Sequence, residues 1–336
     1  MGGRMNAVQG GDRFAFAAWF TRALAAAALL FASAAPSQEF PQRPIRILVA
    51  YSAGAPPDIA ARVLAAHMTG TLGQSVVVEN KPGAIGVVAM TELLKQPADG
   101  YNLLTMLVPV ISAPALLKGV KIDPVKDFEA VAQYTWSYSV LVTSPASPIN
   151  TVNELVAAIR ARPAAFSFAS GGHGTPAHLA GELFNQTYQV DAVHVPYNQF
   201  PQAIADLASG RVSYMFLTTT VAVPNVKGGK LKAIGVAANE RLAALPQVPT
   251  LAEQGFRDFD VRAWDGLVVR AGTPRPVIDR LNRAVNAAVA APEVRERLGS
   301  LGLDVVAGTP QQYAELIRRD TERFSALIRA RNITAE

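Results

Sequence analysis

The sequence contains no cysteine, and its content of charged residues is low. Of its 336 residues, 17% are Asp, Glu, Lys or Arg, whereas 50% are hydrophobic. Without a thiol the chain cannot form a disulfide, a thiolate nucleophile, a Cys-ligated metal centre or an iron–sulfur cluster. The apolar content excludes intrinsic disorder, and the length corresponds to about two domains of roughly 150 residues each. Any chemistry must therefore depend on oxygen and nitrogen groups.

The sequence also lacks a clustered basic segment of the kind that binds nucleic acid. The net charge is +5, but the Lys and Arg residues are dispersed along the chain. Residues 1–34 carry three Arg and one Asp, so the rest of the chain has a net charge of only +3. A small, dispersed charge excess gives no electrostatic footprint for a polyanion. We therefore expect no nucleic-acid partner, and we expect a monomer.

No stretch of the sequence is apolar over the ~20 residues that a transmembrane helix needs. A shorter apolar stretch, residues 24–32, follows three arginines. Ala32-Ser33-Ala34 stands at its end. A basic region, a short apolar region and an A-x-A site are typical of a secretory signal peptide. The pattern predicts a signal peptide over residues 1–34, cleavage near Ala34 and a periplasmic protein, with an uncleaved anchor as the alternative.

From residue 44 onward, short β-rich apolar runs alternate with amphipathic helical segments. This order is typical of α/β folds, because parallel strands need long crossovers that helices provide. The predicted strands are 44–50, 75–79, 101–106, 128–134, 139–143, 165–169, 192–196, 212–217, 231–237 and 260–269. The predicted helices are 58–70, 85–95, 152–161, 175–187, 202–208, 274–290, 293–300 and 311–329.

Two of these runs, 128–134 and 231–237, bracket the middle of the chain. We interpret them as the two crossings between lobes, each lobe being a mostly parallel sheet flanked by helices. The first lobe would comprise 35–128 and 241–336, and the second 129–240. Two α/β lobes joined by two crossings form a hinged ligand clamp.

Three loops between a strand and a helix are candidate ligand sites, because ligands bind at the carboxyl ends of strands in open α/β sheets. In the first, Gly54 permits an unusual backbone angle and the N–H groups of residues 53–55 are available to an anion. Asp58 is either a ligand contact or a first-turn acid that pairs with Arg62. The candidates in this loop are Ser52, Ala53, Gly54, Ala55 and Asp58.

The second loop combines glycines with a Ser hydroxyl and an N-capping Thr, which is typical of an anion cradle or of a tight turn. The third has amide side chains where the others have glycines, and its aromatic residues are suited to cover an apolar ligand. The candidates are Ser170, His173, Gly174 and Thr175 in the second loop and Tyr197, Asn198, Gln199 and Phe200 in the third. Trp136, near a predicted crossing, is a further candidate.

The sequence has little that indicates catalysis. It contains no G-x-S-x-G, H-E-x-x-H or Walker A motif. Two of its four histidines, His173 and His178, are five residues apart, which is the wrong spacing for two metal ligands on one helix face. We expect no metal, no cofactor and no enzymatic activity. A serine hydrolase using Ser170 or Ser52 stays open, because catalytic triads assemble only in the fold.

Nine segments in one consistent order, among them LGQSVVVENKPGAIG, SGGHGTPAHLAGELF and WDGLVVRAGTP, carry a family resemblance. From about residue 39 to the C-terminus the chain resembles the Bug-type periplasmic solute receptors of tripartite tricarboxylate transporters. The resemblance implies a two-lobed Venus-flytrap binding protein without catalytic activity that serves membrane permease subunits. It also implies a small carboxylate ligand held by backbone N–H groups of the loops at 52–58 and 197–200, with 170–175 as a third contributor.

The chain departs from the family pattern at three places. It has Gly54-Ala55 instead of two adjacent glycines, an Asn-Gln-Phe sequence at 198–200 instead of Lys and glycines, and an apolar segment at 107–112. Together with Trp136, these residues favour an aromatic carboxylate, unless they only repack the loops. A receptor that presents its ligand to a sensor kinase is a further alternative that the sequence does not distinguish from transport.

Overall fold

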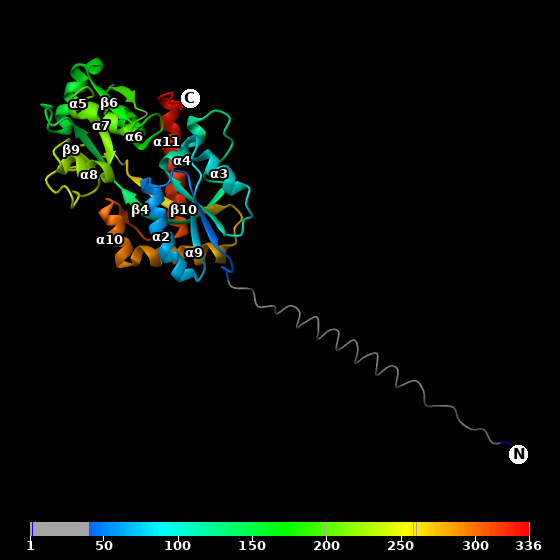
Figure 1. The fold of residues 1–336 in the computed structure, drawn as a ribbon. Helices are drawn as coiled ribbons and strands as arrows, with labels where there is room; N and C mark the ends of the chain where they lie inside the picture. The colour runs from blue at the N-terminus through cyan, green and yellow to red at the C-terminus, as the bar shows by residue number, and fades with distance from the viewer. Residues whose placement is uncertain (1, 3–39, 198, 258, 260, 336) are drawn as a thin grey trace. The chain divides into compact units, whose positions relative to one another are not determined.

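The computed structural model describes residues 2, 40–197, 199–257, 259 and 261–335. The predicted signal peptide, apart from Gly2, and its cleavage site lie outside these residues. Met1–Gln42 and Arg43–Glu336 are separate units, and the following description concerns the second (Figure 1). Within the described residues, no helix combines the length and the apolar character that crossing a bilayer requires.

The chain from Arg43 onward forms two sheets flanked by helices, which confirms the predicted two-lobed α/β architecture. The larger sheet has the order β11-β4-β10-β3-β1-β2 and the smaller one β7-β6-β8-β5-β9. The strands of the larger sheet are β1 (Ile45–Val49), β2 (Val76–Asn80), β3 (Asn102–Leu107), β4 (Phe128–Ser137), β10 (Ala263–Arg270) and β11 (Asp304–Val305). Those of the smaller sheet are β5 (Ser139–Thr143), β6 (Ser167–Ser170), β7 (Val193–Pro196), β8 (Tyr214–Thr218) and β9 (Lys232–Ala237).

Both sheets are mixed, so the expectation of mostly parallel sheets is wrong. β1 is parallel to β2 and β3, and β6 is parallel to β7 and β8, as helical crossovers require. β10 is antiparallel to β3 and β4, and β5 is antiparallel to β8 and β9. These antiparallel strands lie next to the two segments in which the chain crosses from one sheet to the other. No helical crossover sets the strand direction there.

The two runs interpreted as crossings are ordinary sheet strands. β4 pairs with β10 along its whole length, and β9 pairs with β5. The chain passes from the larger to the smaller sheet at Tyr138, between β4 and β5, and returns within 238–262, between β9 and β10. The lobe limits themselves, including 129–240 for the second lobe, stay a prediction, and we propose that they follow these two passages.

Most helices lie where the period of apolar residues predicts them. They are α2 (Pro56–Leu72), η1 (Ala84–Gly86), α3 (Val87–Leu94), α4 (Val108–Leu116), α5 (Val152–Ala161), η2 (Pro163–Ala165), α6 (Pro176–Tyr188), α7 (Phe200–Ala208), α8 (Thr219–Lys227), α9 (Arg275–Ala290), α10 (Pro292–Ser300) and α11 (Pro310–Ala330). α4 and α8 are absent from the sequence prediction. Each contains an internal proline, Pro114 or Pro224, which normally indicates a helix end, and α4 is buried almost all round, so it has no amphipathic period.

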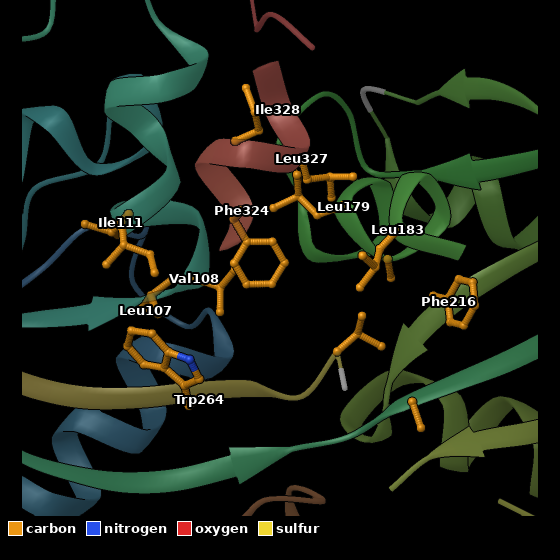
Figure 2. Close-up of a cluster of buried hydrophobic side chains, with 14 of the residues drawn as sticks. Leu107, Val108, Ile111, Leu179, Leu183, Phe216, Trp264, Phe324, Leu327 and Ile328 are labelled. Atoms are coloured by element: carbon orange, nitrogen blue, oxygen red, sulfur yellow. The ribbon is translucent and has the colours of Figure 1, made fainter. Parts of the chain in front are cut away.

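The C-terminal helix α11 packs against both α4, which follows β3 of the larger sheet, and α6, which follows β6 of the smaller sheet (Figure 2). Phe324, Leu327 and Ile328 of α11 belong to one buried apolar cluster with Ile111 of α4 and Leu179 of α6. An Arg331–Glu182 ion pair of 2.7 Å adds a polar link from the end of α11 to α6. The same helix therefore covers parts of both lobes.

Candidate functional site

A cavity of about 390 Å³ lies at the carboxyl ends of the parallel strands of both sheets. Most of its lining residues follow β1, β3, β6, β7 or β8 in the chain or lie in the last three residues of β3 or β8. The others lie at the end of β4, at the start of β5, at the start of β10 and just before β11. They are Tyr51, Pro56, Pro57, Leu107, Val108, Pro109, Ser137, Ser139, Gly171, Thr175, Pro176, Ala177, Phe200, Phe216, Thr218, Thr220, Val221, Ala263, Trp264, Asp265 and Leu303. The position matches the strand edge at which α/β sheets bind ligands.

Five helices begin at this cavity. The first residues of α2, α4, α6, α7 and α8 all contribute to its lining. A helix N-terminus carries a partial positive charge and N–H groups without intrahelical acceptors, although Pro56, Pro57, Pro109 and Pro176 have no N–H to donate. The cavity therefore favours an anion, although none of its described lining residues is Lys, Arg or His.

The rest of the lining is apolar with a few hydroxyl groups. Phe200, Phe216, Trp264 and Leu107 supply aromatic and aliphatic surface, and five Ser or Thr residues supply hydroxyls. An apolar pocket with a small number of placed polar groups is typical of a small-molecule site. Such a lining suits a ligand with an apolar body and an anionic end.

In the first candidate loop, Tyr51, Pro56 and Pro57 line the cavity, whereas the predicted residues Ser52, Ala53, Gly54 and Ala55 do not. Gly54 has φ +83°, which is the left-handed conformation that its type permits. Its N–H donates to Asp58 Oδ2 at 2.8 Å and is therefore not free for a ligand.

Asp58 organises this loop. Its buried carboxylate also accepts hydrogen bonds from Arg62 Nε at 3.1 Å and Asn80 Nδ2 at 2.8 Å. Burial alone raises the pKa of Asp58, but the hydrogen bonds from Arg62, Gly54 and Asn80 outweigh it and hold the pKa below its usual value. These contacts match the first-turn pairing with Arg62, and Asp58 is not among the cavity-lining residues.

In the second loop, Thr175 and Gly171 reach the cavity. Thr175 also caps α6 by accepting a hydrogen bond from the His178 N–H. Gly174 donates its N–H to His178 Nδ1 at 3.0 Å, so this group is not available to a ligand. Ser170 is fully buried and, like His173 and Gly174, does not line the cavity.

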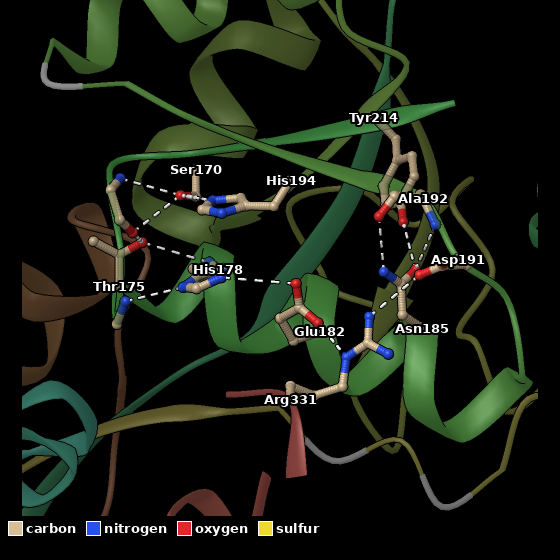
Figure 3. Close-up of polar contacts among 12 residues, drawn as sticks. Ser170, Thr175, His178, Glu182, Asn185, Asp191, Ala192, His194, Tyr214 and Arg331 are labelled. Atoms are coloured by element: carbon tan, nitrogen blue, oxygen red, sulfur yellow. Dashed lines mark hydrogen bonds and ion pairs between the residues drawn. The ribbon is translucent and has the colours of Figure 1, made fainter. Parts of the chain in front are cut away.

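Three histidines, His173, His178 and His194, meet beside this loop. Figure 3 shows two of them, His178 and His194. The rings of His178 and His194 stack with centroids 3.8 Å apart, and His173 lies edge-on to both at 5.1 Å. Helical spacing alone does not reveal the group, because His194 comes from β7. One nitrogen of each residue lies within 4.8 Å of the others, but the near-parallel planes of His178 and His194 do not direct their lone pairs at one point. The arrangement as it stands is a packed imidazole cluster rather than a metal centre.

The Ser170–His194 pair bears on the hydrolase alternative. Ser170 Oγ lies 2.7 Å from His194 Nε2, which is the spacing of a nucleophile and its base. Burial, together with the neighbouring His178 and His173, lowers the pKa of His194 to about 3. A base with so low a pKa binds a proton weakly at neutral pH, and Ser170 has no exposed surface. The pair therefore suits packing better than proton abstraction.

In the third loop, Phe200 lines the cavity, whereas Tyr197 and Gln199 do not. The Tyr197 hydroxyl donates to Asp206 at 3.0 Å, and Gln199 is exposed just before α7. Asn198 lies outside the described residues. Contact of any of these residues with a ligand stays a prediction.

Trp136 lies away from the cavity. Its ring has the Arg262 guanidinium 4.2 Å from the centroid, whereas its neighbour Ser137 lines the cavity. Successive side chains of a strand point to opposite faces, which explains the difference between these adjacent residues.

Sequence reasoning missed several lining residues, including Thr218, Thr220 and Asp265, and it considered Leu107 and Val108 only as part of the apolar segment at 107–112. The two threonines could have been found, because they follow the predicted strand 212–217 just as the three candidate loops follow their strands. For Asp265 the signal was an acid beside the apolar residues of the predicted strand 260–269, where an uncompensated charge is costly.

Comparison with known proteins places these features in a family. The family model "Tripartite tricarboxylate transporter family receptor" matches residues 60–333. The chain is similar to the periplasmic binding protein BugD, with 31% identity, a TM-score of 0.72 and coverage of 88% of this chain and 100% of the other. It is similar to MatC of Rhodopseudomonas palustris with bound malate, with 33% identity, a TM-score of 0.73 and coverage of 86% and 100%. R. palustris Rpa4515 with adipate has 26% identity, a TM-score of 0.75 and coverage of 88% and 99%.

Proposed function

The chain belongs to the family of tripartite tricarboxylate transporter receptors, and from this premise we propose that it is a periplasmic receptor for a small carboxylate. Malate and adipate, the ligands of two similar structures, are both small carboxylates. The proposed ligand occupies the cavity between the two sheets and is delivered to membrane permease subunits of a tripartite tricarboxylate-type transporter.

One observation carries this proposal: five helix N-termini meet at an apolar cavity that has no cationic lining residue among those described. Helix N-terminal N–H groups bind a carboxylate without the desolvation of a buried Lys or Arg. The aromatic surface of Phe200, Phe216 and Trp264 then favours an acid with a flat apolar body. We therefore propose an aromatic carboxylate as the preferred ligand.

The proposed mechanism is a shift between open and closed forms. The cavity lining combines residues of both lobes, so a ligand in contact with all of them binds the closed form better. The passages at Tyr138 and 238–262 act as the hinge, and the permease recognises the closed form.

Isothermal titration calorimetry on the chain from residue 35 onward tests the proposal. The panel contains aliphatic and aromatic mono- and dicarboxylates, each with its methyl ester or amide as an uncharged match. We expect binding of free acids, loss of binding for the uncharged matches, and the tightest binding among aromatic acids. Tight binding of a sugar or a cationic ligand, without any response to carboxylates, would overturn the proposal.

Two variants locate the site. Phe200→Ala removes aromatic surface from the cavity and should weaken binding of an aromatic acid about tenfold or more. Trp136→Leu removes a comparable aromatic ring outside the cavity and should leave the affinity unchanged. Equal losses in both variants would contradict the assignment of the cavity as the site.

A serine hydrolase is the second candidate, and the 2.7 Å Ser170–His194 contact is the observation that favours it. Incubation with activated esters tests it directly. Turnover that is abolished in Ser170→Ala would support the hydrolase, and turnover that persists in this variant would exclude Ser170 as the nucleophile.

A further inference from the structure

We infer that Asp265 forms a second polar subsite, and that the carboxylate ligand carries a hydroxyl or amino hydrogen-bond donor on the part of its body that faces this residue. The inference rests on the proposed function, because it assumes a carboxylate in the same cavity. It adds the chemical class of the ligand: a hydroxy or amino acid rather than a simple or doubly acidic one.

Asp265 is placed at the ligand-binding edge of the larger sheet. It lies in β10 opposite Leu107, the last residue of β3, and opposite Thr135 of β4. The register of β10 against β4 shifts between Asp265 and Gly266, and such a bulge re-aims side chains near binding sites. Asp265 is therefore a cavity-lining residue on the central strand between β3 and β4.

Asp265 is also the single charged residue among the described residues that line the cavity. In the described part of the chain its carboxylate has one hydrogen-bond donor, the Thr135 hydroxyl, at 2.9 Å from Oδ2. A carboxylate has about four acceptor positions, so most of this capacity is unused. Asp265 is partly buried, and a partly desolvated carboxylate without a cation or further donors is unfavourable, which points to a partner supplied by the ligand.

The titratable groups around Asp265 do not neutralise it. Tyr51 after β1, Tyr134 in β4 and Tyr313 in α11 all feel its charge, and burial together with this charge raises the pKa of each phenol. These groups therefore stay neutral. Burial raises the pKa of Asp265 itself to about 6, so the residue is mostly ionised at pH 7.5 and mostly neutral at pH 5.

The ligand is oriented by this charge. An ionised Asp265 repels a ligand carboxylate placed against it, so the carboxylate lies toward the helix N-termini instead. A donor on the opposite end of the ligand forms a charge-assisted hydrogen bond with Asp265, which is stronger than a neutral one. A second carboxylate on the end of the ligand that faces Asp265 is disfavoured, because the ionised Asp265 repels it.

The experiment compares benzoic acids that differ by one ring substituent, at position 4 in all substituted probes except 3-hydroxybenzoate. The probes are 3- and 4-hydroxybenzoate, 4-(aminomethyl)benzoate, 4-methoxybenzoate, terephthalate and benzoate, titrated calorimetrically into the chain from residue 35 onward. The methoxy compound has the size of a donor-bearing acid but donates no hydrogen bond. We expect at least one hydroxy or aminomethyl acid to bind about tenfold or more tightly than the methoxy acid, and terephthalate to bind more weakly than benzoate.

Two substitutions identify the residue and the kind of donor. In Asp265→Leu the preference for donor-bearing acids should vanish while benzoate still binds. In Asp265→Asn the amide oxygen still accepts from a hydroxyl, so a hydroxy acid should lose less affinity than the ammonium of 4-(aminomethyl)benzoate. Asp279→Asn, an exposed acid in α9, is the matched control and should change nothing.

The pH dependence adds a measurement that a purely structural role would not produce. Preference for the aminomethyl acid should fall between pH 7.5 and pH 5 as Asp265 becomes neutral, and it should be independent of pH in Asp265→Asn. Equal binding of methoxy and donor-bearing acids to the unmodified chain, or an unchanged preference in Asp265→Leu, would overturn the inference alone. Failure of every carboxylate to bind would instead overturn the proposed function and this inference with it.

Discussion

Two aspartates of the first lobe show how environment determines what one residue type does. Asp58 accepts hydrogen bonds from Gly54, Arg62 and Asn80, and these contacts lower its pKa. Asp265 has one donor and a pKa raised to about 6. The first carboxylate therefore stabilises the fold at neutral pH, and the second destabilises it.

Asp58→Ala should lower the free energy of unfolding at pH 7 by about 2–3 kcal/mol, because Asn80 and the Gly54 N–H lose their acceptor. A lowered pKa means that this stabilisation is present above the ordinary value of 3.8 and is lost as the pH falls through the folded-state value. Urea denaturation measures both effects.

The control for Asp58 is Asp279→Ala, which removes the same kind of i,i+4 Asp–Arg pair from an exposed helix face. Exposed pairs contribute about 1 kcal/mol or less. Equal losses in the two variants would show that the loop contacts of Asp58 add nothing.

Asp265→Asn should raise the free energy of unfolding of the ligand-free protein at pH 7.5 by about 1–2 kcal/mol, because it removes a desolvated charge. Since the folded-state pKa is raised, the destabilisation by Asp265 grows as the pH rises from 3.8 through about 6 and is absent at lower pH. Denaturation at pH 7.5 and at pH 4 separates the two regimes. A variant that is less stable at pH 7.5 would contradict the assignment.

At the scale of elements, the sequence predicts helices whose apolar residues follow a helical period. It does not predict buried helices without such a period, or the partners of strands. α5, α9 and α11 have a clear apolar face, and their predicted bounds agree with the structure within a residue or so. α4 is apolar on all sides and contains Pro114, so it resembles a loop in sequence. The roles of β4 and β9 in the sheets depend on their partners, which no local pattern reveals.

The same distinction applies to the site. The three candidate loops all lie beside the cavity, because the rule that places ligands at carboxyl ends of strands is topological. The individual lining residues differ from the predicted ones, since the direction of a side chain depends on hydrogen bonds such as that from Tyr197 to Asp206 of α7, which the sequence does not reveal. The cluster of His173, His178 and His194 likewise forms only when β7 lies beside β6.

Packing between α6 and β6 gives a prediction at this scale. A Cβ on Gly181 of α6 would lie 2.2 Å from the Phe168 ring of β6, whereas one on Gly70 of α2 would meet nothing within 4 Å. Gly181→Ala should therefore lower the free energy of unfolding by about 1–3 kcal/mol. Gly70→Ala, the matched helical substitution, should raise it by about 0.5–1 kcal/mol. Thermal or urea unfolding distinguishes the two, and a stabilising Gly181→Ala would contradict the packing.

At the scale of the whole molecule, the cluster of His173, His178 and His194 makes stability depend on pH. The pKa of His194 is lowered to about 3 and that of His173 is lowered as well, chiefly by burial. The unfolded chain binds protons below about 6.5, whereas the folded chain does not until the pH is much lower. The free energy of unfolding should therefore fall as the pH decreases from 6.5, and His194→Asn should make this decline shallower.

Asp265 has the opposite effect on the free energy of unfolding over part of this range. It gains a proton more readily in the folded state, so its contribution to stability rises as the pH decreases from about 6 toward 3.8. Combining His194→Asn with Asp265→Asn should restore a decline close to that of the unmodified chain. Denaturation series between pH 7.5 and pH 4.5 measure these slopes. A decline that His194→Asn leaves unaltered would refute the contribution of the cluster.

The chain has three tryptophans, and one of them, Trp19, lies in the predicted signal peptide. Of the other two, Trp264 lines the cavity and donates to Asp320 at 2.7 Å, while Trp136 lies against Arg262 outside it. Indole emission responds to the polarity around the ring. A chain from residue 35 onward therefore carries one tryptophan at the cavity and one outside it as an internal reference, and ligand occupancy can be followed optically without any attached dye.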